Sequence, residues 1–116
     1  MPFFKWSEMK SDFITPGYSS ARGANIRGEV IEVGRFFYPA GTQAKPHSHP
    51  NEQVQVMLSG RIKSIVAGEE RILGPGEAVL IPAETEHSLE VLEDTEVINC
   101  KNTVQGWSVH DARWEK

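Results

Sequence analysis

Two histidines separated by a single residue are the strongest chemical signal in the sequence. In an extended strand, side chains two residues apart point to the same side, so His47 and His49 present both imidazole rings to one face. Gln53 follows at an even spacing, and its amide oxygen also points inward if the chain resumes strand geometry after Pro50. Imidazole nitrogens and a neutral amide oxygen can bind a divalent metal and leave positions open for water or a substrate. These side chains therefore predict part of a metal site.

A third histidine lies much later in the chain. His87 follows an apolar segment and the turn at residues 83–86, and we expect it to begin a strand that pairs with the strand carrying Gln53. Two histidines at this spacing, taken alone, more often belong to a surface loop. The regularly spaced turn residues around the histidines instead favour a functional metal site over a chance arrangement. The sequence thus predicts one divalent ion, which Zn, Ni, Fe, Mn or Co can supply, held by His47, His49, Gln53 and His87.

Short segments of alternating polarity make up most of the remaining chain. Gln53, Gln55 and Met57 alternate with three aliphatic residues, and we expect these first three to face the interior. Turn-forming glycines and prolines separate the segments, and helical spacing is absent. The pattern predicts one all-β domain over residues 1–116, a sandwich or barrel of about eight strands. The expected strands span residues 29–38, 53–58, 61–66, 71–73, 78–82, 87–92, 95–101 and, on a weaker pattern, 107–114.

Composition excludes several classes of partner. The net charge is -4, with 12 Lys and Arg against 16 Asp and Glu and no basic run, so neither nucleic acid nor an anionic membrane is expected as a partner. The apolar runs fall short of the ~20 residues that a membrane span needs. The single cysteine, Cys100, forms no internal disulfide, and the N-terminus lacks a signal-peptide pattern, so we expect a cytoplasmic protein.

Trp107 and Trp114 are expected to cap the barrel mouth or to cover a strand of a second copy, and His110 to lie on the surface or at a subunit contact.

The ordered set of histidines and turn residues resembles the two sequence motifs of the cupin family over residues 28–100. The resemblance implies a double-stranded β-helix, that is, a jelly-roll barrel, and by likeness to other cupins a homodimer. Three positions depart from the pattern: Gln53 replaces glutamate, Glu84 replaces glycine and Val91 replaces asparagine. Motif 1, residues 41–60, contains Gly41, His47, His49, Gln53 and Gly60, and motif 2, residues 76–91, contains Gly76, Pro82 and His87.

The segment from His47 to Gly60 is most similar to the small KdgF-type cupins of pectin breakdown, which linearise unsaturated uronates and also use glutamine as a metal ligand. Counted from His87, the Asp, Phe and Arg that act in catalysis in those enzymes correspond to Asn99, Lys101 and Gln105. The resemblance therefore extends to the metal ligands and not to the residues of the uronate reaction.

Three functions remain open on this sequence. The donors are neutral, so a bound ion keeps its full charge, which favours Lewis-acid chemistry of the isomerase or lyase type on a small sugar-acid or keto-acid-like molecule. A metal-dependent dioxygenase is the first alternative, although such enzymes often use a carboxylate ligand. A non-catalytic cupin that binds a sugar or another small molecule is the second alternative.

Two interior side chains could carry protons in such a reaction. Lys101 and the hydroxyl of Tyr38 are the candidate catalytic groups. Each has a structural alternative: Lys101 as an exposed lysine on an edge strand, and Tyr38 as core or interface packing.

Overall fold

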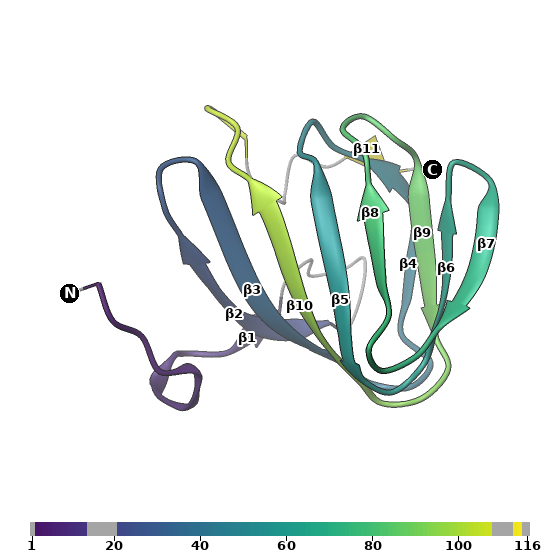
Figure 1. Cartoon of the computed structure of the whole chain (residues 1–116), viewed down its shortest axis with the longest axis horizontal. Coiled ribbons are helices and arrows are strands. Elements are labelled where there is room, and N and C mark those ends of the chain that lie inside the picture. The colour runs from purple at the N-terminus through teal and green to yellow at the C-terminus, as the bar shows by residue number, and fades with distance from the viewer. Residues whose placement is uncertain (1, 14–20, 108–112, 115–116) are drawn as a thin grey trace.

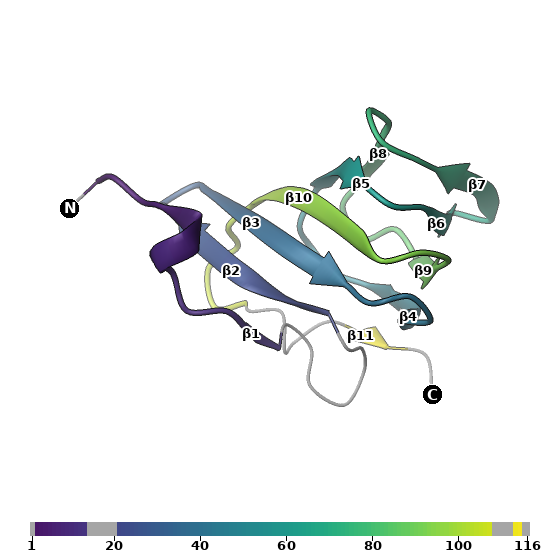
Figure 2. The same cartoon turned by 90° about the horizontal axis from the view of Figure 1, so that it is seen from below.

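The computed structural model describes residues 2–13, 21–107 and 113–114, and it consists of two antiparallel sheets that face each other (Figures 1 and 2). This arrangement confirms the predicted all-β jelly-roll fold. A short 3₁₀ turn, η1 (Trp6–Glu8), precedes the first strand. In spatial order, the six-stranded sheet contains β1 (Asp12–Phe13), β2 (Arg22–Arg27), β3 (Ile31–Tyr38), β10 (Thr95–Asn102), β5 (Gln53–Ser59) and β8 (Ala78–Ile81), and the five-stranded sheet contains β11 (Arg113–Trp114), β4 (Gln43–Ser48), β9 (His87–Val91), β6 (Ile62–Val66) and β7 (Glu69–Leu73).

Most of the predicted strands are observed, but β1, β2 and β4 were not among the predicted segments. β2 was not predicted, because Arg22–Arg27 has no alternation of apolar and polar residues. It is nevertheless a strand, since it pairs along its length with β3. From the segment predicted at 107–114, the described residues contain only β11 as a strand. Pairing with an adjacent strand thus determines the structure where the local sequence pattern is weak.

The interior changes from apolar to polar along the strands. On β10, the inward-facing side chains run from Val97, which is fully buried, through Asn99 to Lys101. On β9 of the opposite sheet, they run from Val91, which packs in the core, to His87. One end of the barrel therefore holds the two sheets together by apolar burial, at about 1.5–3 kcal/mol for each large side chain. The other end is lined by polar side chains, among them His87, Asn99 and Lys101.

The predicted inner face of β5 is confirmed. Gln55 and Met57 are buried, whereas Val54 and Leu58 on the outer face are exposed. The apolar core consists of Ala21, Phe36, Tyr38, Met57, Ile62, Leu73, Val91 and Val97.

Two turn glycines allow a matched test of this packing. Gly60 and Gly68 both have left-handed backbones, with φ of +84° and +83°. A Cβ at Gly60 would lie 2.3 Å from both the Asp94 carbonyl oxygen and the Thr95 hydroxyl, whereas a Cβ at Gly68 meets nothing within 4 Å. Gly68→Ala is therefore expected to lower the free energy of unfolding by roughly 1 kcal/mol, and Gly60→Ala by roughly 3 kcal/mol or more. Urea denaturation of both variants checks this, and equal losses would contradict the packing at Gly60.

Candidate metal centre

Three histidines from separate segments meet at the polar end of the barrel. His47 lies on β4 and is the direct cross-strand partner of His87, the first residue of β9. His49 follows one residue after the end of β4. The ring centroids are 4.1 Å apart for His47 and His87, 4.8 Å for His49 and His87, and 6.0 Å for His47 and His49. One ligand atom from each ring lies within 4.8 Å of the other two, so the cluster is suited to a single ion.

The backbone around each histidine sets which ring nitrogen is available. In all three rings, Nδ1 lies within hydrogen-bond distance of a main-chain carbonyl oxygen two residues away in the sequence. A carbonyl only accepts, so each Nδ1 carries the proton and donates, and each Nε2 is left unprotonated. The three contacts are His47 Nδ1 to Lys45 O at 2.8 Å, His49 Nδ1 to Asn51 O at 3.2 Å and His87 Nδ1 to Thr85 O at 2.9 Å.

Burial keeps the three rings uncharged. Desolvation, followed by the nearby charge of His87, lowers the pKa of both His47 and His49 from 6.5 to about 4. Desolvation also lowers the pKa of His87. Near neutral pH the cluster therefore offers three neutral imidazoles, which is the protonation state that binds a metal.

These pKa shifts predict a pH dependence for the metal-free protein. Between the folded pKa of about 4 and the unfolded value of 6.5, the unfolded chain binds more protons at His47 and His49 than the folded one. The free energy of unfolding should therefore fall as the pH is lowered from about 7 towards 4. Urea unfolding of chelator-treated protein at pH 7.5 and pH 5 measures the difference. His47→Gln should reduce the pH dependence, and an unchanged dependence would contradict the burial of this ring.

Gln53 completes the cluster from the opposite sheet. It is the first residue of β5, and its Oε1 lies 3.2 Å from His49 Nε2. With the proton of His49 on Nδ1, both of these facing atoms are hydrogen-bond acceptors, and two acceptors at this distance repel each other unless a cation lies between them. The donor set therefore fits a metal ion. His47, His49, His87 and Gln53 are the side chains that would hold it.

A network of side-chain amides orients Gln53. Its Nε2 donates to Asn99 Oδ1 at 3.1 Å, which turns its Oε1 towards the histidines. Asn99 Nδ2 and Gln55 Nε2 in turn donate to the hydroxyl of Tyr38, at 3.1 and 3.2 Å. Burial raises the pKa of Tyr38 to about 12, so this hydroxyl stays protonated. The structure thus places Tyr38 behind the cluster, as an anchor for two amides, and joins it to Gln53 through Asn99, which the sequence analysis did not select.

Two details of the predicted arrangement are wrong. The chain crosses from the five-stranded to the six-stranded sheet between β4 and β5, so the even spacing from His49 to Gln53 does not place them on one face. They converge because the two sheets face each other. The strand that begins at His87 pairs with β4 and β6, and not with the strand that carries Gln53. Asn102 secures the crossing: its carbonyl accepts from Asn51 Nδ2 at 2.8 Å, and its side chain accepts from the Glu52 backbone at 2.7 Å.

Glu84 explains one departure from the cupin motif. It stands at the position that is usually glycine, and it adopts a left-handed backbone with φ of +62°. Its backbone N–H donates to the His49 carbonyl at 2.8 Å, so the turn before β9 supports the histidine segment. The substitution has therefore kept the turn geometry that glycine ordinarily provides.

Lys101 lies on a central strand. β10 is placed between β3 and β5, so the alternative of an exposed edge lysine is wrong (Figure 1). The Lys101 Nζ is 5.5 Å from the centroid of the Trp107 ring, and this ring is 5.6 Å from the ring of His49. Trp107 thus lies against His49, one of the three clustered histidines. Gln105 is exposed, and His110 and the side chain of Trp114 lie outside the described residues.

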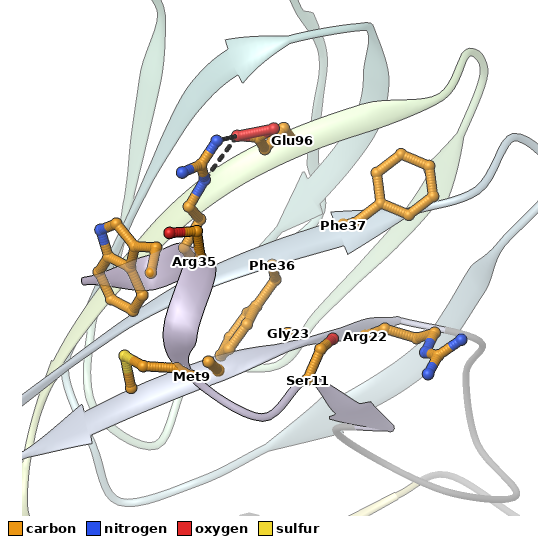
Figure 3. Close-up of a pocket in the computed structure, with 11 residues that line it drawn as sticks. Met9, Ser11, Arg22, Gly23, Arg35, Phe36, Phe37 and Glu96 are labelled. Atoms are coloured by element: carbon orange, nitrogen blue, oxygen red, sulfur yellow. Dashed lines mark hydrogen bonds and ion pairs between the residues drawn. The ribbon is translucent and has the colours of Figure 1, made fainter. Parts of the chain in front are cut away.

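A pocket on the other side of the six-stranded sheet is separate from this cluster (Figure 3). Arg35 Nε donates to Glu96 Oε2 at 2.7 Å along its rim, and the ring of Phe36 lies against Gly23. A further pocket lies between the edge strands β7 and β8. None of the predicted site residues lines either pocket.

Comparisons with known proteins agree with the fold. The structure of KdgF from a Halomonas species is similar, with a TM-score of 0.79, 24% sequence identity and coverage of 91% of this chain and 96% of that one. An RmlC-like cupin from Shewanella frigidimarina has a TM-score of 0.81 and 15% identity, covering 91% of this chain and 94% of that one. Oxalate decarboxylase from Bacillus subtilis, which has Mn(II) centres, matches 96% of this chain over 31% of its own length, with a TM-score of 0.74 and 18% identity.

The sequence itself identifies the family. No curated protein sequence is significantly similar to the chain. No helix among the described residues is long and apolar enough to cross a membrane. The cupin domain matches residues 34–98, which is more than half of the chain and includes all three clustered histidines. The chain belongs to the cupin domain family.

Proposed function

We propose that the protein binds one divalent metal ion through His47, His49, His87 and Gln53, and that it catalyses an isomerase or lyase type of reaction on a small oxygenated acid. The observation that carries this proposal is the set of three unprotonated Nε2 atoms that converge with a neutral amide oxygen. When bound by such donors, a divalent ion polarises a carbonyl or hydroxyl oxygen of the ligand. The protein supplies the orientation of the donors and a buried setting that limits access of water.

The neutral donor set supports one of the two metal-dependent alternatives over the other. No carboxylate belongs to the histidine cluster in the described part of the chain, which favours Lewis-acid chemistry over a dioxygenase. The same lack of a carboxylate beside the histidines favours, as the second candidate, a cupin that binds a small molecule without transforming it. Lys101, with Tyr38 as the more distant group, is proposed as the proton carrier that distinguishes a catalyst from a binding protein.

Metal analysis of protein purified without chelator or nickel resin tests the first step. The proposal requires about one divalent ion per chain, with Mn, Zn, Ni, Fe and Co as the candidates; the Mn(II) centres of the similar oxalate decarboxylase support Mn. Screening of uronates and keto acids under aerobic and anaerobic conditions tests the second step. Turnover that consumes oxygen would replace the proposed function by a dioxygenase, and binding without turnover would favour the second candidate.

We propose a small-molecule ligand in the barrel and a homodimer in a cytoplasmic setting, without nucleic acid or a membrane as a partner. Light scattering coupled to size exclusion measures the mass in solution, and a mass of one chain would exclude the dimer.

A further inference from the structure

Lys101 places a cation inside the barrel beside the histidine cluster. It continues the inward-facing series of Val97 and Asn99 on β10, and its cross-strand partners are Glu32 on β3 and Gln53 on β5. Gln53, its partner on β5, in turn has Oε1 3.2 Å from Nε2 of His49 in the cluster. The ammonium is therefore close enough to act on a molecule bound at the cluster.

The Lys101 ammonium forms no ion pair in the described part of the chain; the charge of Glu32 acts on it, but desolvation outweighs this and lowers the Lys101 pKa. Its Nζ lies over the Trp107 ring, 5.5 Å from the centroid, and it forms neither a hydrogen bond nor an ion pair in the described residues. Glu32 is the cross-strand neighbour, but its carboxylate accepts from Asn25 Nδ2 at 2.8 Å and makes no ion pair with Lys101. A half-buried ammonium without a partner is destabilised by desolvation, so an anion that enters the barrel would be bound favourably.

Trp107 provides a second donor without an acceptor. Its indole Nε1 is buried and has no hydrogen-bond partner among residues 2–13, 21–107 and 113–114. Buried N–H groups of this kind usually find a partner. The same indole ring contacts both the Lys101 ammonium and the ring of His49. Two donors that lack acceptors thus lie around one ring, next to the candidate metal ligands.

The charges of the neighbouring strands also favour an anion. Arg27, Glu32 and Lys101 are consecutive cross-strand partners on β2, β3 and β10. This row contains two cations and one carboxylate, although the whole chain carries a net charge of -4. This row beside the cluster therefore carries one net positive charge, even before a metal ion is counted.

The geometry points to a carboxylate subsite made by Lys101 Nζ and Trp107 Nε1, which restricts the ligand to small acids whose hydroxyl or carbonyl oxygen lies next to the carboxylate. This inference rests on the proposed metal function and adds the class of substrate. A carboxylate has two oxygens, so it can accept from the ammonium and from the indole N–H together. The adjacent hydroxyl or carbonyl oxygen then lies on the side of the histidines.

Ligand binding to the cobalt-loaded protein tests the subsite without an assay of activity. The visible spectrum of bound Co(II) reports ligands, and the two probes are glycolate and its neutral amide, glycolamide. We expect wild type to bind glycolate about 10-fold or more tightly than glycolamide. Lys101→Met should reduce this preference several-fold, leaving the part that the charge of the metal ion provides, and Lys101→Arg should keep it in full. Trp107→Phe, which keeps the ring and removes the donor, should weaken glycolate binding by about 3-fold to 10-fold.

Lys63→Met is the matched control, because Lys63 is also half-buried but faces Glu90, with Nζ 3.4 Å from the carboxylate. It should bind both probes as wild type does. Equal affinity of wild type for the two probes, a preference that is undiminished in Lys101→Met, or no response to either probe would overturn the subsite. In the first two cases the proposed metal function stands, since the probes still reach the ion. Failure of wild type to bind cobalt would instead remove the proposed function and the subsite with it.

Discussion

His49→Ala is expected to lose most of its bound metal while the barrel stays folded. Its ring lies between the other members of the site, 4.8 Å from the His87 ring and with Nε2 3.2 Å from Gln53 Oε1. Removal of a partner that merely orients a metal ligand weakens binding by about 10-fold to 100-fold, so loss of a ligand should exceed that range. Elemental analysis gives the metal content per chain, and circular dichroism checks the fold.

Ser48→Ala is the control for His49→Ala. Ser48 is the last residue of β4, lies between His47 and His49 in the sequence, and is half-buried. It should keep the wild-type metal content. If His49→Ala also kept its full metal content, His49 would not be a ligand.

Asn99→Leu is expected to weaken metal binding by about 10-fold or more, although Asn99 is not a ligand. Asn99 Oδ1 holds the Gln53 amide at 3.1 Å, and without it the Gln53 side chain is free to turn its oxygen away from the histidines. Competition with a chelator measures the affinity, and the visible spectrum of the cobalt-loaded protein reports the change in donors.

Asn99→Asp separates this role from simple packing. Aspartate still accepts from Gln53 Nε2, and its second oxygen can accept from the Tyr38 hydroxyl, which is protonated at neutral pH. This variant should keep tight metal binding and the wild-type cobalt spectrum. Wild-type affinity in Asn99→Leu would show that the amide network does not position Gln53.

The histidine cluster could be predicted because its signal is local and regular. The spacing of His47 and His49, and the turn residues before His87, can be read directly from the sequence. Alternation along β5 also predicted correctly that Gln55 and Met57 face inward. These features depend on the geometry of a single strand, which a few neighbouring residues determine.

The remaining features depend on which strands pair, and alternation does not encode pairing. The sequence made Lys101 a candidate interior residue but left an exposed edge strand as the alternative; only the position of β10 between β3 and β5 excludes that alternative. Gln53 reaches the histidines because the chain changes sheets after His49. The role of Asn99 follows from its contacts with Gln53 and Tyr38, which are distant in the sequence. Such long-range contacts require the folded structure.

Crystallography with anomalous scattering at the absorption edge of the bound metal tests the central claim most directly. The account predicts one peak inside the barrel, with bonds of about 2.0–2.3 Å to the Nε2 atoms of His47, His49 and His87 and with Gln53 Oε1 as the fourth donor. A peak bonded through Nδ1, or located away from these three rings, would contradict it.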